Sequence, residues 1–179
     1  MKVMNWVAVE ESQGGNQLKP GGYVITIQDV EDVEDREYLR ITYDVKEGEF
    51  AGVYSTNWGV QNPWAHQFIR SYKESAQGMF KAFLNRLEES NRGMNPPFTV
   101  AGWQVHCSPR AFVGLEVGIV LQTEQYTNNK GEDKERLVVR SVEASQDIRN
   151  GDYKLPAPQD NRTREEQPAQ PAELVDTPF

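Results

Sequence analysis

The chain has 179 residues and a formal net charge of -8 at pH 7, with 37% hydrophobic and 26% charged residues. This length is enough for one domain with its own core. No apolar run reaches about 18 residues, which excludes a membrane-spanning helix. The single cysteine, Cys107, excludes an internal disulfide and is typical of a protein in a reducing cytoplasm.

The charges are segregated along the chain. Residues 29–49 hold nine acids against three basic residues, whereas residues 58–110 hold six basic residues against three acids. A local basic face matters more for capturing a polyanion than the total charge does. The negative net charge therefore does not exclude a nucleic-acid partner.

The first strands of a small β-barrel are expected between residues 18 and 54. Apolar and polar residues alternate over residues 23–28 and again over residues 38–45, which is the period of a strand. The acidic residues 29–37 between them are expected to form a solvated loop. A third short strand is expected over residues 50–54.

One strong helix is expected within residues 71–93, because apolar residues recur there at helical spacing. They are Met79, Phe80, Phe83, Leu84 and Leu87. The aromatic stretch 56–68 before the helix is broken by glycine and proline and is expected to be a loop. After the helix, residues 103–107 are expected to form a short strand.

Two long strands are expected last, over residues 113–121 and 136–142, joined by a hairpin turn at residues 128–131. Three strands, a helix and two strands follow one another in the order of the OB-fold, a five-stranded Greek-key barrel. Other small α+β domains share this order. We expect a mainly β fold with one main helix, in the form of an OB-fold-like barrel.

The sequence divides into three parts. Residues 1–17 are expected to form an N-terminal arm or strand, and residues 18–154 the OB-like domain. Residues 155–179 are rich in Pro, Gln, Ala and charge, a composition typical of disorder. We therefore expect a flexible acidic tail that ends in a Pro-Phe tip.

Four stretches of the chain resemble a family of small phage and prophage proteins from Gram-positive hosts. They read PGGYVITIQDVEDV, EYLRITYDVKEGEFAGVY, FIRSYKESAQGMFKAFLNRLEESN and IRNGDYKLP, and the resemblance spans roughly residues 18 to 156. Many members of that family have no assigned function, and some are identified as single-stranded-DNA-binding proteins with an OB-fold. The resemblance implies common ancestry with that family, and with it the OB-fold, more directly than it implies the binding activity of some members.

The end of the chain, ELVDTPF, resembles the tip of bacterial single-stranded-DNA-binding proteins. Those proteins end in a flexible linker, several acids, an apolar residue and Pro-Phe. Asp176, Pro178 and Phe179 match this pattern, whereas Thr177 stands where the family has an aliphatic residue. The resemblance implies that the tip recruits replication or recombination proteins. The alternative is a chain end that finishes in Phe by chance.

Single strands are held by aromatic stacking together with a cationic groove. The stacking candidates lie on a strand face opposite the apolar one, or in the loop before the helix. They are Tyr38, Trp58, Trp64, Tyr72 and Phe112, with Trp103 in addition. The alternative is that aromatic residues fill the core. It is preferred for Tyr23, Tyr43, Phe80 and Phe83.

The candidates for phosphate contact are basic residues next to the helix or on solvent-facing strand positions. They are Arg40, Arg70, Lys73, Arg136 and Arg140. The alternative is that such positions carry charge only because they face water.

No catalytic or metal-binding signature is present. The acidic residues 29–37 lack the spacing of a calcium-binding loop, and the two histidines and Cys107 lack the further ligands of a zinc site. Glu132-Asp133-Lys134 is expected at a hairpin tip rather than in a nuclease site. We expect no enzymatic activity and no cofactor.

Two functions from different classes follow. The first is a cytoplasmic, phage-type protein that binds single-stranded DNA in replication or recombination and recruits partners through its C-terminal tip. The second is an OB-like protein-interaction module that contacts a recombinase or a host factor and does not bind DNA. The net charge favours the second. The sequence leaves open the choice between DNA and RNA, and assembly into homo-oligomers.

Overall fold

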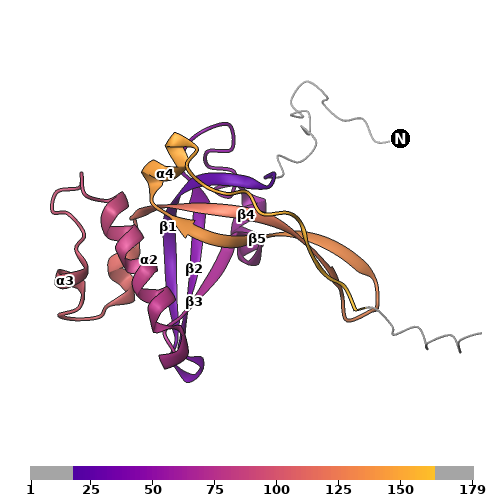
Figure 1. Cartoon of the computed structure of the whole chain (residues 1–179), viewed down its shortest axis with the longest axis horizontal. Helices are drawn as coiled ribbons and strands as arrows, with labels where there is room; N and C mark the ends of the chain where they lie inside the picture. Colours follow the sequence, from indigo (N-terminus) through magenta and orange to yellow (C-terminus); the bar gives the residue numbers. More distant parts are fainter. Residues whose placement is uncertain (1–17, 164–179) are drawn as a thin grey trace, which may run out of the picture.

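The computed structural model describes residues 18–163, which form a mainly β structure with one main helix (Figure 1). The expected N-terminal arm, residues 1–17, lies outside the described residues, as do the tip residues Asp176, Pro178 and Phe179. Within the described part, no helix is long and apolar enough to cross a membrane.

Five strands form the main path of one sheet in the order β3-β2-β1-β4-β5, and β6 pairs with β4 beside this path. The strands are β1 (Gly21–Val33), β2 (Tyr38–Val45), β3 (Gln67–Ser71), β4 (Glu116–Thr127), β5 (Asp133–Glu143) and β6 (Gln159–Asn161). The pairings along the main path are antiparallel, whereas β6 runs parallel to β4. No pairing among residues 18–163 joins β3 to β5, so the expected barrel closure is not shown.

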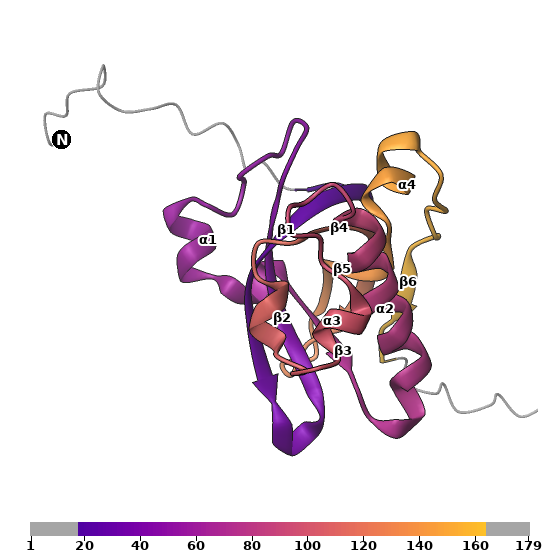
Figure 2. The same ribbon diagram turned by 90° about the vertical axis from the view of Figure 1, so that its left-hand side faces the viewer.

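The helices are α1 (Asn57–Gln61), α2 (Gln77–Ser90), α3 (Val100–Trp103) and α4 (Ser145–Asn150). Figure 2 shows α1 and α2 on opposite sides of the β1–β2 hairpin. Short 3-10 turns at Glu34–Arg36, Pro63–His66, Glu74–Ala76 and Pro109–Phe112 join the longer elements.

β1 and β2 form a hairpin at the positions that the alternation predicted. Ile27 of β1 and Ile41 of β2 are fully buried, and the register shifts between Ile27 and Asp29. β1 continues to Val33, so most of the acidic stretch that was expected to be a loop is strand. Only the 3-10 turn Glu34–Arg36 and Glu37 remain outside the hairpin ladder.

The third strand is not where the sequence predicted it. Residues 50–54 form turns, because the buried carboxylate of Asp44 accepts a hydrogen bond from the N–H of Tyr54 at 3.0 Å and another from the hydroxyl of Ser55. These bonds fold the chain back onto the end of β2. The third strand is β3, which lies at the end of the stretch that was expected to be a loop and extends just beyond it.

α2 is the predicted helix, and it closes the core. Its Phe83, Leu84 and Leu87 are buried. The ring centroid of Phe83 lies 6.4 Å from that of Phe68 on β3 and 5.8 Å from that of Phe112. The helix therefore joins the third strand to the segment that leads into β4.

Residues 103–107 do not form the predicted strand. Trp103 ends α3, whose first turn is capped by Thr99: the hydroxyl oxygen accepts the N–H of Gly102 at 3.1 Å. Cys107 has a φ of +48°, a left-handed conformation that strands do not contain. The segment is a helical turn followed by a chain reversal.

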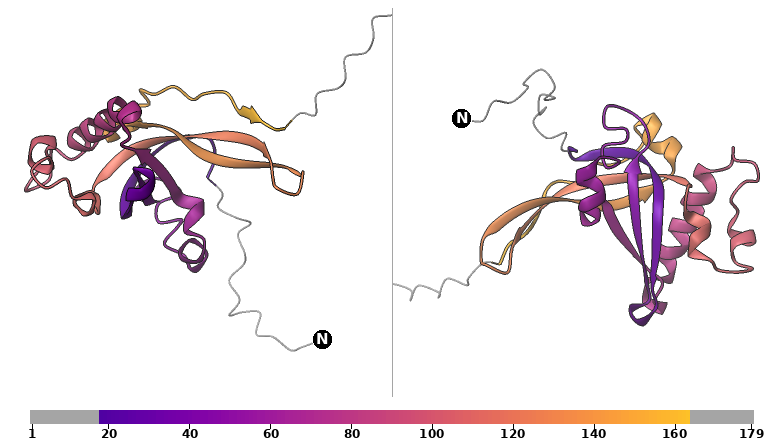
Figure 3. Two further views of the ribbon diagram at one scale, coloured as in Figure 1. Left: turned by 90° about the horizontal axis from the view of Figure 1, so that it is seen from below. Right: turned by 180° about the vertical axis from the view of Figure 1, so that it is seen from behind.

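β4 and β5 form a long hairpin that extends away from the rest of the molecule (Figures 1 and 3). β1 pairs with β4 only as far as Leu121, so we call the part beyond it, residues 122–138, the arm. At its tip the N–H of Gly131 donates to the carbonyl oxygen of Asn128 at 2.9 Å, which confirms the predicted turn.

The chain returns along the arm after α4. Gln159–Asn161 pair with Glu124–Tyr126, and the side-chain amide of Asn161 donates to Glu124 Oε1 at 2.6 Å. These residues belong to the stretch that was expected to be a flexible tail. They form a short strand instead, on the edge of β4 that β1 leaves free.

Candidate nucleic-acid interface

Two exposed tryptophans form the most prominent aromatic surface of the described residues. Trp58 on α1 is 54% exposed and Trp64 in the following 3-10 turn is 71% exposed. Their ring centroids lie 6.3 Å apart at an interplanar angle of 70°. We call this pair the tryptophan platform.

Local hydrogen bonds and a close backbone contact hold α1 in place. The hydroxyl oxygen of Thr56 accepts the N–H of Gly59 at 3.3 Å and caps the helix. A Cβ on Gly59 would lie 2.0 Å from the carbonyl oxygen of Tyr54, so only glycine allows this approach. Asn62 ends the helix, because its side-chain amide donates to the carbonyl oxygen of Trp58 at 2.8 Å.

His66 fixes the end of the same segment to β2. It is buried, and its ring stacks on that of Tyr54 with centroids 4.5 Å apart. Nδ1 lies 2.5 Å from the carbonyl oxygen of Tyr43, and Nε2 lies 3.1 Å from that of Gly59. From the sequence, His66 was considered only as one of two histidines that lack the further ligands of a zinc site, so its role in placing the platform was missed.

The outer face of β2, on the side away from the core, carries Tyr38 and Arg40 as predicted. Arg40 Nη2 donates to the Tyr38 hydroxyl oxygen at 3.2 Å, and Arg40 Nη1 to Glu31 Oε2 at 2.5 Å. The bond to Glu31 raises the pKa of Arg40. Ile69 of β3 pairs with Arg40 in the ladder and is 56% exposed. This face therefore offers a ring, an exposed aliphatic side chain and an arginine that is already paired.

The arm carries a second cation beside a ring. The guanidinium of Arg136 lies 4.7 Å from the ring centroid of Tyr126, and its Nε donates to Glu124 Oε2 at 2.5 Å. Burial opposes ionisation of Glu124, but hydrogen bonds from Arg136 and Asn161 outweigh it and hold its pKa below the ordinary value. Arg140 is the extra residue of a bulge in β5 and is exposed.

The basic candidates beside α2 are not brought together on that outer face. Arg70 lies over the rings of Phe68 and Phe83, at 4.9 and 5.9 Å from their centroids, and burial lowers its pKa to about 10. Tyr72 donates its hydroxyl hydrogen to Asp32 Oδ1 at 2.8 Å, a bond that raises its pKa to about 12. Lys73 is exposed.

Phe112 is not a surface residue, contrary to the prediction. Its side chain is fully buried, and its ring stacks on that of Trp103 with centroids 5.3 Å apart. The prediction assumed strand alternation with Val113. The 3-10 turn Pro109–Phe112 breaks that alternation, so Phe112 faces the core and Val113 is 45% exposed.

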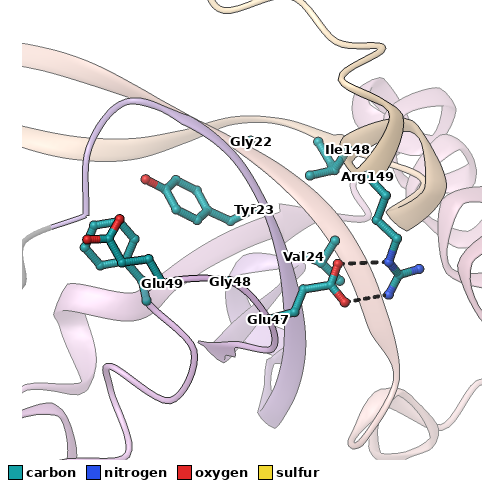
Figure 4. A pocket seen from close by; sticks show the side chains of 9 residues that line it. Gly22, Tyr23, Val24, Glu47, Gly48, Glu49, Ile148 and Arg149 are labelled. Atoms are coloured by element: carbon teal, nitrogen blue, oxygen red, sulfur yellow. Dashed lines mark hydrogen bonds and ion pairs between the residues drawn. The ribbon is translucent and has the colours of Figure 1, made fainter.

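A pocket of about 240 Å³ lies between the start of β1, the turn at residues 47–50 and α4 (Figure 4). Arg149 lines it and binds Glu47 through two hydrogen bonds, at 2.9 and 3.1 Å. The same guanidinium also donates to Glu116 at 3.0 Å. With two carboxylates already bound, Arg149 is a structural link rather than an anion site. Within residues 18–163, no group of His, Cys, Asp or Glu side chains could hold a metal ion.

The chain matches no protein-family model and no curated protein sequence.

Proposed function

We propose that this protein is a non-enzymatic, phage-type single-stranded-DNA-binding protein of the host cytoplasm. The observation that carries the proposal is the tryptophan platform, with two large rings exposed next to each other on one segment. Stacking on exposed rings is how proteins hold single strands without reading their sequence. Figure 2 shows α1 on the side of the β1–β2 hairpin away from α2. Tyr38 and Arg40 are half-buried positions on the outer face of β2.

The strand order supports an OB-type ancestry. The path β3-β2-β1-β4-β5, with α2 between β3 and β4, is the path of an OB-fold that stays open between its third and fifth strands. OB-folds bind single strands across their second and third strands and the loops that join strands 1 and 2 and strands 4 and 5. In this protein β2 and β3 carry Arg40 and Ile69, and the tryptophan platform lies on the segment that connects these two strands.

The C-terminal tip belongs to the same proposal. Asp176, Pro178 and Phe179 combine a carboxylate with a terminal aromatic ring, which suits a small apolar pocket rimmed by basic residues on a replication or recombination protein. Deleting residues 176–179 should abolish capture of such a partner and leave the affinity for DNA unchanged.

Fluorescence anisotropy with a labelled oligothymidine tests the DNA-binding proposal. We expect micromolar or tighter binding that weakens steeply as salt is raised. The double variant Trp58→Ala/Trp64→Ala should bind about tenfold or more weakly, since each stacked base contributes about 1–3 kcal/mol. Met79→Ala is the matched control, because Met79 is 72% exposed on α2 and away from the platform. No binding at low salt would end the proposal.

A second candidate is a protein-interaction module, and the ion pairs favour it. Arg40 and Arg136 are each bonded to a glutamate of the neighbouring strand, which reduces the positive charge that a phosphate would meet. In this case Trp58, Trp64 and Ile69 would bind an apolar protein surface. The variant Trp58→Ala/Trp64→Ala would then fail to capture a recombinase or host factor in a pull-down. Neither the wild type nor this variant would bind oligothymidine.

A further inference from the structure

His66 is a buried side chain that joins the tryptophan platform to the sheet. It is 3% exposed, and each of its ring nitrogens faces a backbone carbonyl oxygen. Tyr43 O belongs to β2, and Gly59 O belongs to α1, next to Trp58. The ring therefore bridges the sheet and the helix that carries half of the platform.

A neutral imidazole cannot satisfy both contacts. It has one N–H, and the other nitrogen carries a lone pair that repels a carbonyl oxygen. The imidazolium has two N–H groups and donates to both. Its positive charge also faces the parallel ring of Tyr54 at 4.5 Å, an arrangement that favours a cation.

We propose that His66 is the positioning residue of the tryptophan platform, and that it acts as an imidazolium donating to Tyr43 O and Gly59 O. Loss of the proton to solvent leaves one carbonyl oxygen facing a lone pair and releases α1 from β2. Binding of single-stranded nucleic acid then becomes linked to pH. This inference rests on the proposed function for its effect on binding, but the state of His66 is measurable without any nucleic acid.

The other titratable groups on the elements packed against His66 are Tyr38, Arg40, Tyr43 and Asp44 of β2 and Tyr54 of the preceding turn. Tyr38 and Arg40 lie toward the opposite end of β2 from Asp44. Burial raises the pKa of Tyr54 to about 12 and raises that of Tyr43 as well, so neither tyrosine changes charge between pH 5 and 9. The carboxylate of Asp44 accepts hydrogen bonds from Val45, Tyr54 and Ser55. α1 and the 3-10 turn contribute no titratable side chain besides His66 itself.

The first experiment uses the full chain alone. The ring nitrogens of the ¹⁵N-labelled protein are observed by NMR at pH 6, and the signals of His66 are those that remain in the variant His106→Gln. The chain has only one other histidine, His106, which is exposed. We expect both nitrogens of His66 to be protonated. A neutral ring with one N–H in the folded protein at this pH would overturn the proposal, and this result does not depend on the folding of His66→Phe.

The second experiment measures tryptophan emission and oligothymidine affinity from pH 6 to pH 8.5. His66→Phe keeps the ring that stacks on Tyr54 and removes both donors. We expect it to bind about tenfold more weakly at pH 6, with an emission spectrum independent of pH. The wild type and the control His106→Gln should both lose affinity as pH rises, with a matching change in emission.

The outcomes separate the two proposals. If the wild type and His66→Phe share one pH profile, in emission and in affinity, the positioning role of His66 is wrong. If no protein binds oligothymidine, the proposed function fails, while the NMR and emission results still decide the state of His66.

Discussion

A Cβ on Gly118 of β4 would lie 2.4 Å from Cγ1 of Ile148 on α4. It would also lie 3.0 Å from the carbonyl oxygen of Ala144, so backbone limits the space as well. A Cβ on Gly22 of β1 would likewise lie 2.6 Å from ring carbons of Tyr153. α4 and the residues after it therefore rest directly on the backbone of two paired strands.

Gly118→Ala should lower the free energy of unfolding by about 1–3 kcal/mol, because an added methyl group forces α4 off the sheet. Urea denaturation followed by circular dichroism measures the change. Gly78→Ala is the matched control: a Cβ there meets nothing within 4 Å, and alanine favours the helix by roughly 0.5–1 kcal/mol. Equal stability of the two variants would contradict the close packing of α4.

Releasing the two paired arginines should distinguish the two candidate functions. In Glu31→Gln/Glu124→Gln, Arg40 and Arg136 lose their carboxylate partners and become free to contact phosphates. A DNA-binding protein should then bind oligothymidine more tightly. The plot of log affinity against log salt should also steepen by roughly 0.7 for each arginine that gains a phosphate.

The control for this pair is Glu89→Gln, which removes one of the two carboxylate partners of Arg86 on α2, away from the outer face of β2 and from the arm. It should leave affinity and salt dependence unchanged. An unchanged salt dependence in the double variant would show that neither arginine reaches the strand.

Glu116 should make the free energy of unfolding depend on pH in the acid range. Burial opposes its ionisation, but hydrogen bonds from Arg149 and Lys46 outweigh that effect and hold its pKa below the ordinary value. A carboxyl whose pKa is lowered on folding stabilises the protein at a pH above its unfolded value, and this contribution disappears as pH falls through the folded value. Glu116→Gln should therefore be less stable than the wild type at pH 7, and the gap should narrow as pH falls below the ordinary carboxyl pKa and through the lowered pKa of the folded state.

Chemical denaturation at a series of pH values measures this gap. Glu34→Gln, on the exposed 3-10 turn between β1 and β2, should follow the wild-type curve at every pH. A gap between Glu116→Gln and the wild type that stays constant across the whole acid range would show that the effect comes from shape rather than from charge.

The long strands and the main helix were predictable because their residues repeat with a clear period. Ile27 and Ile41 alternate with polar residues and are fully buried, and Phe83 and Leu87 fall on one face of α2. Periodicity reports burial on one side of an element. It is strong wherever the element is long and one side faces the core.

The third strand could not be located in this way. Residues 50–54 are apolar enough to suggest a strand, but they turn because a buried carboxylate, Asp44, binds their backbone from the end of β2. β3 is only five residues long and lies at the edge of the sheet. The binding of this backbone by Asp44 and the position of β3 at the sheet edge both have no local signal in the sequence.

The candidate site was predictable residue by residue but not as an assembly. Trp58, Trp64 and Arg40 face outward as expected. The glutamates that bind the arginines lie on neighbouring strands, at positions 31 and 124, and only the strand register brings them together. Phe112 was misplaced for the related reason that a 3-10 turn shifts which residues face inward.

The central place of β1 in the sheet has a consequence for folding. β1 and β2 are joined by a turn of a few residues, so their hairpin needs only local contacts. The other edge of β1 pairs with β4, where Gly21 lies opposite Leu121 and Thr26 lies opposite Glu116. These partners are separated by most of the described chain. Contacts between residues so distant in sequence form slowly. We therefore expect the arrival of β4, rather than formation of the hairpin, to set the speed at which the chain reaches its native state.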